Sequence, residues 1–202
     1  MLKYQTNLHK TMEAEDRHLI VTYCRFGGDN VSNVSSDDYL KIFPQHVLNR
    51  VNKAKETFVR LAESHADDEF MKVLLFGQQA VVGLRNYAAS LGLPEERIEL
   101  DANCKDITEM VKKVWNRIRT KPNPPRVYFM LSTWQWVFIE QLLALKDERF
   151  KFYFEGAFDG RASEEVELDK KLEKVAKIAL KTSKIGSMLD KVGGSVSSNL
   201  KG

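Results

Sequence analysis

Cysteine is scarce in this chain of 202 residues, which contains only two. Cys24 and Cys104 lie 80 residues apart, and neither belongs to a CxxC motif or to a cluster with histidine. This scarcity excludes a disulfide scaffold and argues against a zinc site, so we expect no bound metal. Two isolated thiols fit a reducing compartment.

Long apolar runs are also missing. The first ten residues have no apolar core of signal-peptide length. No stretch approaches the ~18 uninterrupted apolar residues that a membrane span needs. We therefore expect a cytoplasmic protein without a transmembrane segment.

No charge of one sign dominates, because 31 lysines and arginines stand against 28 aspartates and glutamates, for a net charge of +3. So small an excess gives no electrostatic case for a nucleic-acid partner. The diagnostic motifs of phosphate-binding loops, serine hydrolases, zinc proteases and EF-hands are absent as well. The sequence therefore leaves open whether the protein is an enzyme.

What the chain does contain is an alternation of short apolar runs with segments of helical periodicity. Several runs are apolar on both faces, which is typical of buried parallel strands. The predicted strands span residues 18–24, 71–76, 97–100, 126–131 and 150–154, and the predicted helices span 45–64, 80–91, 106–119 and 133–145. This order predicts an α/β protein with a three-layer Rossmann-like fold and a mainly parallel sheet of about five strands.

The last 40 residues differ from the rest. Apolar residues recur there at helical spacing and form one stripe, which predicts a long amphipathic helix. We divide the chain into a Rossmann-like domain over residues 1–162, a C-terminal helix over 163–192 and a flexible tail over 193–202. The stripe can pack on the domain, join two copies into a homo-oligomer or lie on a membrane surface, and the sequence leaves these alternatives open.

Candidate site residues follow the predicted strands, because open parallel sheets bind ligands outside the carboxyl ends of their strands. Glycine there lets a ligand approach the backbone, and a following helix N-terminus favours an anion. Hydroxyl and amide groups can hydrogen-bond the ligand, and an indole can stack on it. The candidates for ligand binding are Gly27, Gly28, Asp29, Gly77, Gln78, Asp101, Ser132, Trp134 and Gln135.

Several of these candidates also have a structural interpretation. The Gly27-Gly28 pair fits a tight turn, Ser132 can cap the helix that follows it, and Trp134 can belong to the core.

The catalytic candidates are Asp29, Asp101 and Cys104. The two carboxylates could act as bases. Cys104 lies at a strand-to-helix turn, where a helix dipole would lower the pKa of its thiol.

One segment resembles a known family. Residues 91–101 (LGLPEERIELD) are similar to the LGVPEERI-L-E segment of the YdcF/SanA/ElyC-like family, where it joins a helix to a short strand. Three further motifs keep the family's order, namely residues 25–28 at its glycine-rich turn, 74–78 at its strand ending in Ser-Gly-Gly and 130–135 at its strand ending in Thr-Ser. Arg50 falls where an arginine begins the family's first long helix.

The resemblance covers about residues 18–158 and indicates a divergent member of that family. It implies a Rossmann-like fold with a polar pocket at the strand ends, where Arg50 would face an anion. The fold is compatible with a nucleotide-like ligand such as S-adenosylmethionine, although the resemblance does not identify a cofactor.

The chain departs from the family at the pocket. The family's histidine appears as Gln135, its arginine one turn later is replaced by an apolar residue near Phe138, and its acidic residue has only Gln79 as a polar substitute. Such a pocket lacks the usual general acid, anion clamp and base. The favoured prediction is binding of a phosphorylated or nucleotide-like small molecule at the strand ends, and whether this divergent site also catalyses a reaction is left open. The alternative is a non-catalytic binding or assembly protein that has a degenerate pocket and acts through its C-terminal helix.

Overall fold

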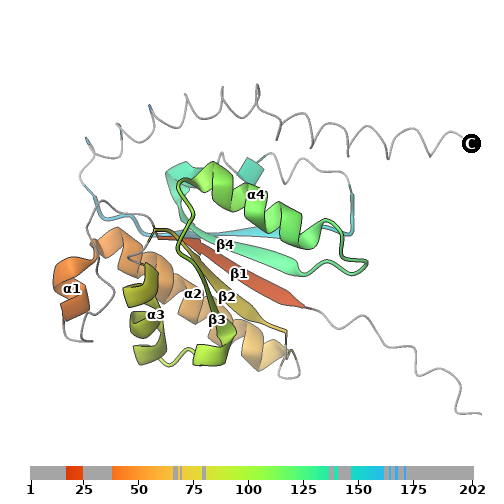
Figure 1. The fold of residues 1–202 in the computed structure, drawn as a ribbon, viewed down its shortest axis with the longest axis horizontal. Coiled ribbons are helices and arrows are strands. Elements are labelled where there is room, and N and C mark those ends of the chain that lie inside the picture. The colour runs from red at the N-terminus through yellow and green to blue at the C-terminus, as the bar shows by residue number, and fades with distance from the viewer. Residues whose placement is uncertain are drawn as a thin grey trace, which may run out of the picture.

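The computed structural model describes residues 17–24, 38–65, 68, 70–78, 81–136, 139–140 and 147–161, together with Glu164, Glu167 and Lys171. Its strands are β1 (His18–Tyr23), β2 (Lys72–Phe76), β3 (Ile98–Asp101), β4 (Arg126–Ser132) and β5 (Phe152–Ala157). They form one sheet in the order β3-β2-β1-β4-β5, and every neighbouring pair is parallel (Figure 1). The predicted α/β class and parallel sheet are confirmed.

The central strand β1 is buried along its whole length. Leu19 lies level with Lys72 of β2 on one side and with Val127 of β4 on the other. A strand that has hydrogen-bonded neighbours on both edges and helices on both faces needs apolar residues at consecutive positions. This explains why the β1 sequence is a nearly continuous apolar run.

Helices cover both faces of the sheet. They are α1 (Tyr39–Ile42), α2 (Gln45–Ser64), α3 (Val81–Ser90) and α4 (Ile107–Ile118), and the short 3-10 turns are η2 (Glu95–Arg97) and η3 (Thr133–Trp136). Figure 1 shows α2 and α3 on one face of the sheet and α4 on the other. The bounds of α2 are those that the sequence predicts, and α3 and α4 lie inside their predicted ranges.

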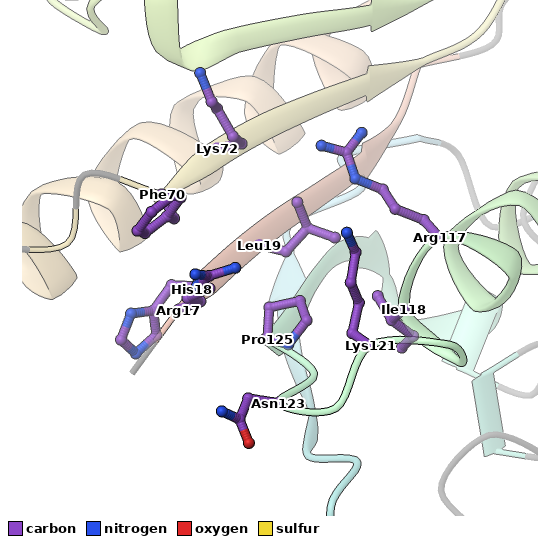
Figure 2. Close-up of a pocket in the computed structure, with 10 residues that line it drawn as sticks. All are labelled: Arg17, His18, Leu19, Phe70, Lys72, Arg117, Ile118, Lys121, Asn123 and Pro125. Carbon is purple, nitrogen blue, oxygen red and sulfur yellow. The ribbon is translucent and has the colours of Figure 1, made fainter. Parts of the chain in front are cut away.

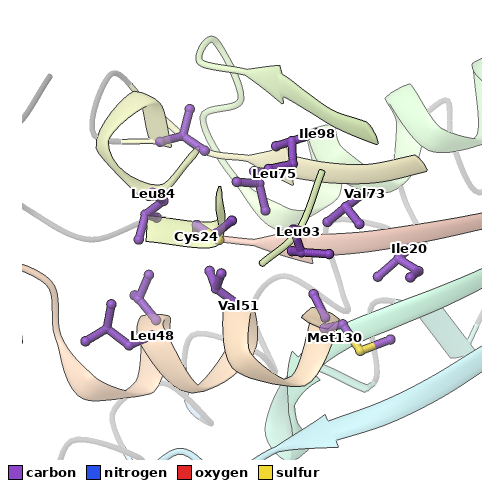
Figure 3. Close-up of a cluster of buried hydrophobic side chains, with 14 of the residues drawn as sticks. Ile20, Cys24, Leu48, Val51, Val73, Leu75, Leu84, Leu93, Ile98 and Met130 are labelled. Atoms are coloured by element: carbon purple, nitrogen blue, oxygen red, sulfur yellow. The ribbon is translucent and has the colours of Figure 1, made fainter. Parts of the chain in front are cut away.

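Alternate residues of the sheet pack into two separate apolar cores. Leu19 and Val21 of β1 face α4, whereas Ile20 and Cys24 face α2 and α3. Figure 3 shows the second core, in which side chains of α2, including Leu48, point toward the sheet. The alternation along β1 therefore ties three layers together at one strand.

The start of α4 is fixed by a reciprocal cap. The Asp106 carboxylate accepts a hydrogen bond from the Glu109 amide at 2.7 Å, and the Glu109 carboxylate accepts one from the Lys105 amide at 2.9 Å. Two amide donors at the helix start, which have no partner within the helix, are satisfied in this way. The acidic residues that the sequence places early in this helix thus set where it begins.

The strand predicted over residues 150–154 begins later and ends later than expected. Phe150 belongs to a turn, where its amide donates to the Asp147 carbonyl at 3.1 Å, and its ring packs on Trp115 with centroids 4.9 Å apart. β5 then pairs with β4 until Ala157 lies level with Ser132. The register with β4, which the local sequence does not show, sets these bounds.

The helix predicted over residues 133–145 begins as the 3-10 turn η3. The Gln135 side chain accepts a hydrogen bond from the Ser132 amide at 3.1 Å, which adds a side-chain bond at the start of this turn. The remainder of that prediction lies largely outside the described residues. Of the C-terminal helix predicted over 163–192, only Glu164, Glu167 and Lys171 are described, so its length and role stay predictions.

Candidate functional site

The order of the sheet marks one place where a ligand site is expected. The chain runs outward from β1 through β2 to β3, and then returns to place β4 on the other side of β1. In open parallel sheets, ligands bind at such a reversal, outside the carboxyl ends of the two strands. Tyr23 ends β1 and Ser132 ends β4 at this point.

Arg50 reaches this point from α2. It shares the buried face of that helix with Val47 and Val51, and only 2% of its surface is exposed. Its Nη1 donates to the Tyr23 carbonyl at 2.7 Å, and its Nη2 donates to the Ser132 hydroxyl at 2.7 Å. One guanidinium therefore joins α2 to the carboxyl ends of β1 and β4.

The third donor position of Arg50 is unsatisfied. Its Nε is buried and has no hydrogen-bond partner in the described part of the chain. Burial lowers the pKa of this guanidinium, although Cys24 and Asp159 oppose that effect. Arginine stays protonated in proteins, so the site holds a buried positive charge whose Nε–H meets no described acceptor. Such a group is costly unless an anion or acceptor meets it.

The negative charge of this network belongs to Asp159. Its Oδ2 accepts from the Trp134 indole at 3.0 Å and from Nη2 of Arg161 at 2.9 Å, and Nε of Arg161 donates to its Oδ1. Burial raises the pKa of this carboxyl, but hydrogen bonds from Arg161, Ser132 and Trp134 outweigh burial and hold the pKa well below its usual range. The Ser132 hydroxyl thus accepts from Arg50 and donates to Asp159.

The chain geometry after β5 makes this arrangement possible. Gly160 has a φ of +68°, in the left-handed region, so the backbone turns between Asp159 and Arg161 and lets their side chains meet. Asn49 of α2 donates to the Phe158 carbonyl at 2.9 Å and fixes the segment against the helix.

The network carries an excess positive charge. It contains the guanidinium of Arg50, which forms no ion pair with a described residue, and the Asp159 carboxylate, which pairs with Arg161. The carboxylate is already shared among three donors. An anion at this edge would therefore meet a net attractive field.

Two other predicted binding residues belong to the same network. The Trp134 indole donates to Asp159, and the guanidinium of Arg161 lies 5.7 Å from the centroid of a Trp134 ring. Gln135 is 2% exposed and holds the Ser132 amide. These side chains support Ser132 and Asp159, so in this structure they position the network. The cap that the sequence suggests for the Ser132 hydroxyl is not observed, since that hydroxyl bonds Arg50.

Gly77, Gln78 and Asp101 lie farther along the same edge, after β2 and β3. The Gly77 amide donates to the Asp101 carbonyl at 3.0 Å, and a Cβ added at Gly77 would meet the Cys24 carbonyl oxygen at 3.3 Å. A larger residue here would crowd the Cys24 backbone, so glycine suits this close packing. Asp101 pairs with Lys113 at 2.8 Å, and Gln78 is exposed. No described contact joins these residues to Arg50.

The two thiols are buried and free. Burial raises the pKa of Cys104 to about 12 and that of Cys24 to about 11. The Cys104 sulfur donates to the Asp106 carbonyl at 3.2 Å. The pKa of Cys104 is therefore raised, not lowered as its strand-to-helix position suggests, because burial outweighs the opposing charge of Lys113. A protonated, buried thiol does not support a nucleophilic role.

Gly27, Gly28 and Asp29 lie outside the described residues, so their role stays a prediction. The sequence analysis missed Asp159 and Arg161. The sequence feature that could have indicated them is the Asp-Gly-Arg segment just after the last strand. It follows the strand directly only when the strand is taken to end at Ala157.

Comparison of the chain with protein-family models, curated proteins and solved structures finds no match. The resemblance to the YdcF/SanA/ElyC-like family therefore stays a prediction. None of the helices in the described ranges is both long enough and apolar enough to cross a membrane. The same ranges contain no group of three or more His, Cys, Asp or Glu side chains that could hold a metal ion.

Proposed function

We propose that the protein binds a phosphorylated or nucleotide-like small molecule at the carboxyl ends of β1, β4 and β5. The observation that carries this proposal is Arg50, a buried guanidinium at the reversal of the sheet whose Nε–H has no described partner. A phosphate is a suitable partner, because its oxygens accept from the planar guanidinium and offset its charge.

Two features of the network favour an anion over a neutral ligand. The buried guanidinium of Arg50 forms no ion pair with a described residue, and the Asp159 carboxylate of the network already accepts from Trp134 and Arg161. Because that carboxylate is held ionised, it acts as a fixed acceptor and does not carry protons near neutral pH. The proposal therefore concerns binding.

Each described side chain has a role in this proposal. Arg50 attracts the phosphate, and Ser132 holds the guanidinium in place through the bond to Nη2. Asp159 orients Ser132, while Trp134 and Arg161 hold Asp159. The family resemblance of the sequence, which implies a polar pocket at this edge with Arg50 toward an anion, agrees with this assignment.

The proposal is tested by calorimetric titration and thermal unfolding of the full chain. The ligands are inorganic phosphate, a sugar phosphate, adenosine mono- and diphosphate and S-adenosylmethionine. A ligand at 100 times its Kd should stabilise the protein by about 2.7 kcal/mol. The ligand that binds best is then used with Arg50→Lys, which keeps the charge but loses the planar donor set.

We expect Arg50→Lys and Ser132→Ala each to weaken binding by about tenfold, since each removes a hydrogen bond that involves a charged group. Arg60→Lys on the exposed side of α2 and Ser90→Ala at the end of α3 are matched controls that should bind like the unaltered protein. Circular dichroism verifies that each variant is folded. Equal affinity in variants and controls, or no binding by any ligand at millimolar concentration, would reject the proposal.

A further inference from the structure

A hollow of about 400 Å³ lies at the amino ends of β1 and β2, on the face of the sheet that α4 covers (Figure 2). It is bounded by the start of β1, the start of β2 and the end of α4, which contribute Leu19, Lys72 and Ile118. The six residues of β1 separate it from the Arg50 site by roughly 17 Å. The two sites are therefore distinct.

The hollow combines an apolar floor with cationic walls. Leu19 and Ile118 are core residues, and Pro125 lies beside them. Four cations surround this floor, namely Arg17, Lys72, Arg117 and Lys121, and none of the described residues that line the hollow is an Asp or Glu. Figure 2 shows Leu19 between Lys72 on one side and Arg117 and Lys121 on the other.

The position of α4 explains only part of this arrangement. The carboxyl end of a helix attracts cations, which accounts for Arg117 and Lys121. Arg17 directly precedes β1 and Lys72 begins β2, so these two cations do not come from α4. Their convergence follows from the sheet, since Lys72 lies level with Leu19 of β1.

The existing contacts of these cations leave the hollow positive. Arg117 donates to the Glu99 carboxylate at 2.6 and 3.2 Å, and this bond lowers the pKa of Glu99. Lys72 donates to the carbonyl of Glu96 at 2.7 Å, which uses a donor but no charge. The Asp68 carboxylate also adjoins the hollow, since it binds His18 and the Phe70 amide. Two described carboxylates therefore stand against four cations.

The aromatic ring of Phe70 adds a second recognition element. Phe70 is 45% exposed, and the guanidinium of Arg17 lies 3.9 Å from the centroid of its ring. An exposed ring beside an apolar floor can contact a flat apolar group, while the cations meet an anionic substituent.

We propose that this hollow binds a small organic phosphate whose phosphate group is attached to a flat apolar body. The phosphate dianion meets Arg117, Lys121 and Lys72, and the apolar body lies on Leu19 and beside Phe70. A dianion suits the charge count better than a carboxylate does, because four cations and the two described acids, Glu99 and Asp68, leave two positive charges. This inference does not depend on the function proposed for Arg50.

The test uses phenyl phosphate as the probe, titrated into the full chain and followed by calorimetry and by chemical-shift changes. Inorganic phosphate lacks the apolar body and phenol lacks the charge, so both should bind more weakly than phenyl phosphate. The double variant Arg117→Ala/Lys121→Ala should weaken binding by about fivefold or more, since it removes two partly exposed ion contacts. Added salt should weaken binding as well.

Arg119→Ala/Lys112→Ala is the matched control, because Lys112 is exposed in the middle of α4, Arg119 is exposed at its end, and neither lines the hollow. This control should keep the affinity of the unaltered chain. Ser132→Ala should also keep it, which separates this site from the Arg50 site. The proposal is overturned if phenyl phosphate does not bind, if both double variants bind it equally, or if only Ser132→Ala loses it.

Discussion

Replacement of Asp159 by asparagine should destabilise the fold much more than its place after an edge strand suggests. Asp159 accepts from Arg161, Trp134 and Ser132, and through Ser132 it also offsets the buried charge of Arg50. Asparagine has nearly the same shape but no charge, and only one of its two polar atoms accepts hydrogen bonds.

The expected cost follows from these contacts. A hydrogen bond to a charged group contributes about 1.5–3 kcal/mol, and the substitution removes about one such bond. It also leaves Arg50 and Arg161 without their carboxylate, which costs more when a charge is buried. We expect the free energy of unfolding to fall by about 3 kcal/mol.

Equilibrium unfolding in urea measures this loss, and Asp147→Asn is its matched control. Asp147 and Arg149 form the same Asp-x-Arg pair as Asp159 and Arg161, but Arg149 is exposed and no buried arginine depends on the pair. The control should cost less than about 1 kcal/mol. A loss at Asp159 no larger than that at Asp147 would refute the view that this network stabilises Arg50.

Three further predictions concern other groups. The pKa of folded His18 lies below its ordinary value of 6.5, chiefly because burial outweighs its bond to Asp68, so acidification protonates the unfolded chain first. The free energy of unfolding should therefore fall as the pH drops below about 6.5, and pH-dependent urea melts should show a smaller fall for His18→Gln. Cys104 should resist iodoacetamide at pH 7.5 in the native protein and react once the chain is unfolded, and rapid native alkylation would contradict its burial. Gly160→Ala should lower the free energy of unfolding by about 1–2 kcal/mol. The reason is that φ of residue 160 is positive and that the new Cβ would lie 3.2 Å from the Phe158 ring. An unchanged unfolding midpoint would show that the turn relaxes.

The elements that the sequence predicts best are those with the strongest local pattern. α2 has apolar residues at helical spacing over its whole length, and β1 and β4 are continuous apolar runs, so their bounds differ little from the prediction. β5 is different. Its aromatic residues begin at Phe150, but the turn at Asp147 and the pairing with β4 decide where the strand starts and ends. Pairing depends on residues far away in the sequence.

The sequence predicts where the candidate site lies but not which of its side chains bond to one another. Arg50 and Ser132 both belong to the predicted set, and the structure brings them to hydrogen-bond distance. The sequence does not show that they bond to each other, nor that Trp134 and Gln135 support them. Asp159 was not predicted because the last strand was predicted to end at Phe154. The strand ends three residues later, at Ala157, so Asp159 lies close to its carboxyl end.

The basic hollow at the other edge illustrates the same limit. A pattern of cations late in α4 is visible in the sequence and is explained by the end of the helix. That Lys72 joins them follows only from the register of β1 against β2.

The central claim is that an anion meets the unpartnered Nε–H of Arg50. Its most direct test is a nitrogen-15 spectrum of the arginine side chains during titration with the best phosphate ligand, with the Arg50 signal assigned by its loss in Arg50→Lys. The account predicts that the Arg50 Nε–H resonance shifts with the same Kd as the calorimetric binding, while that of exposed Arg149 stays in place. A ligand that binds while the Arg50 resonance does not move would contradict the account.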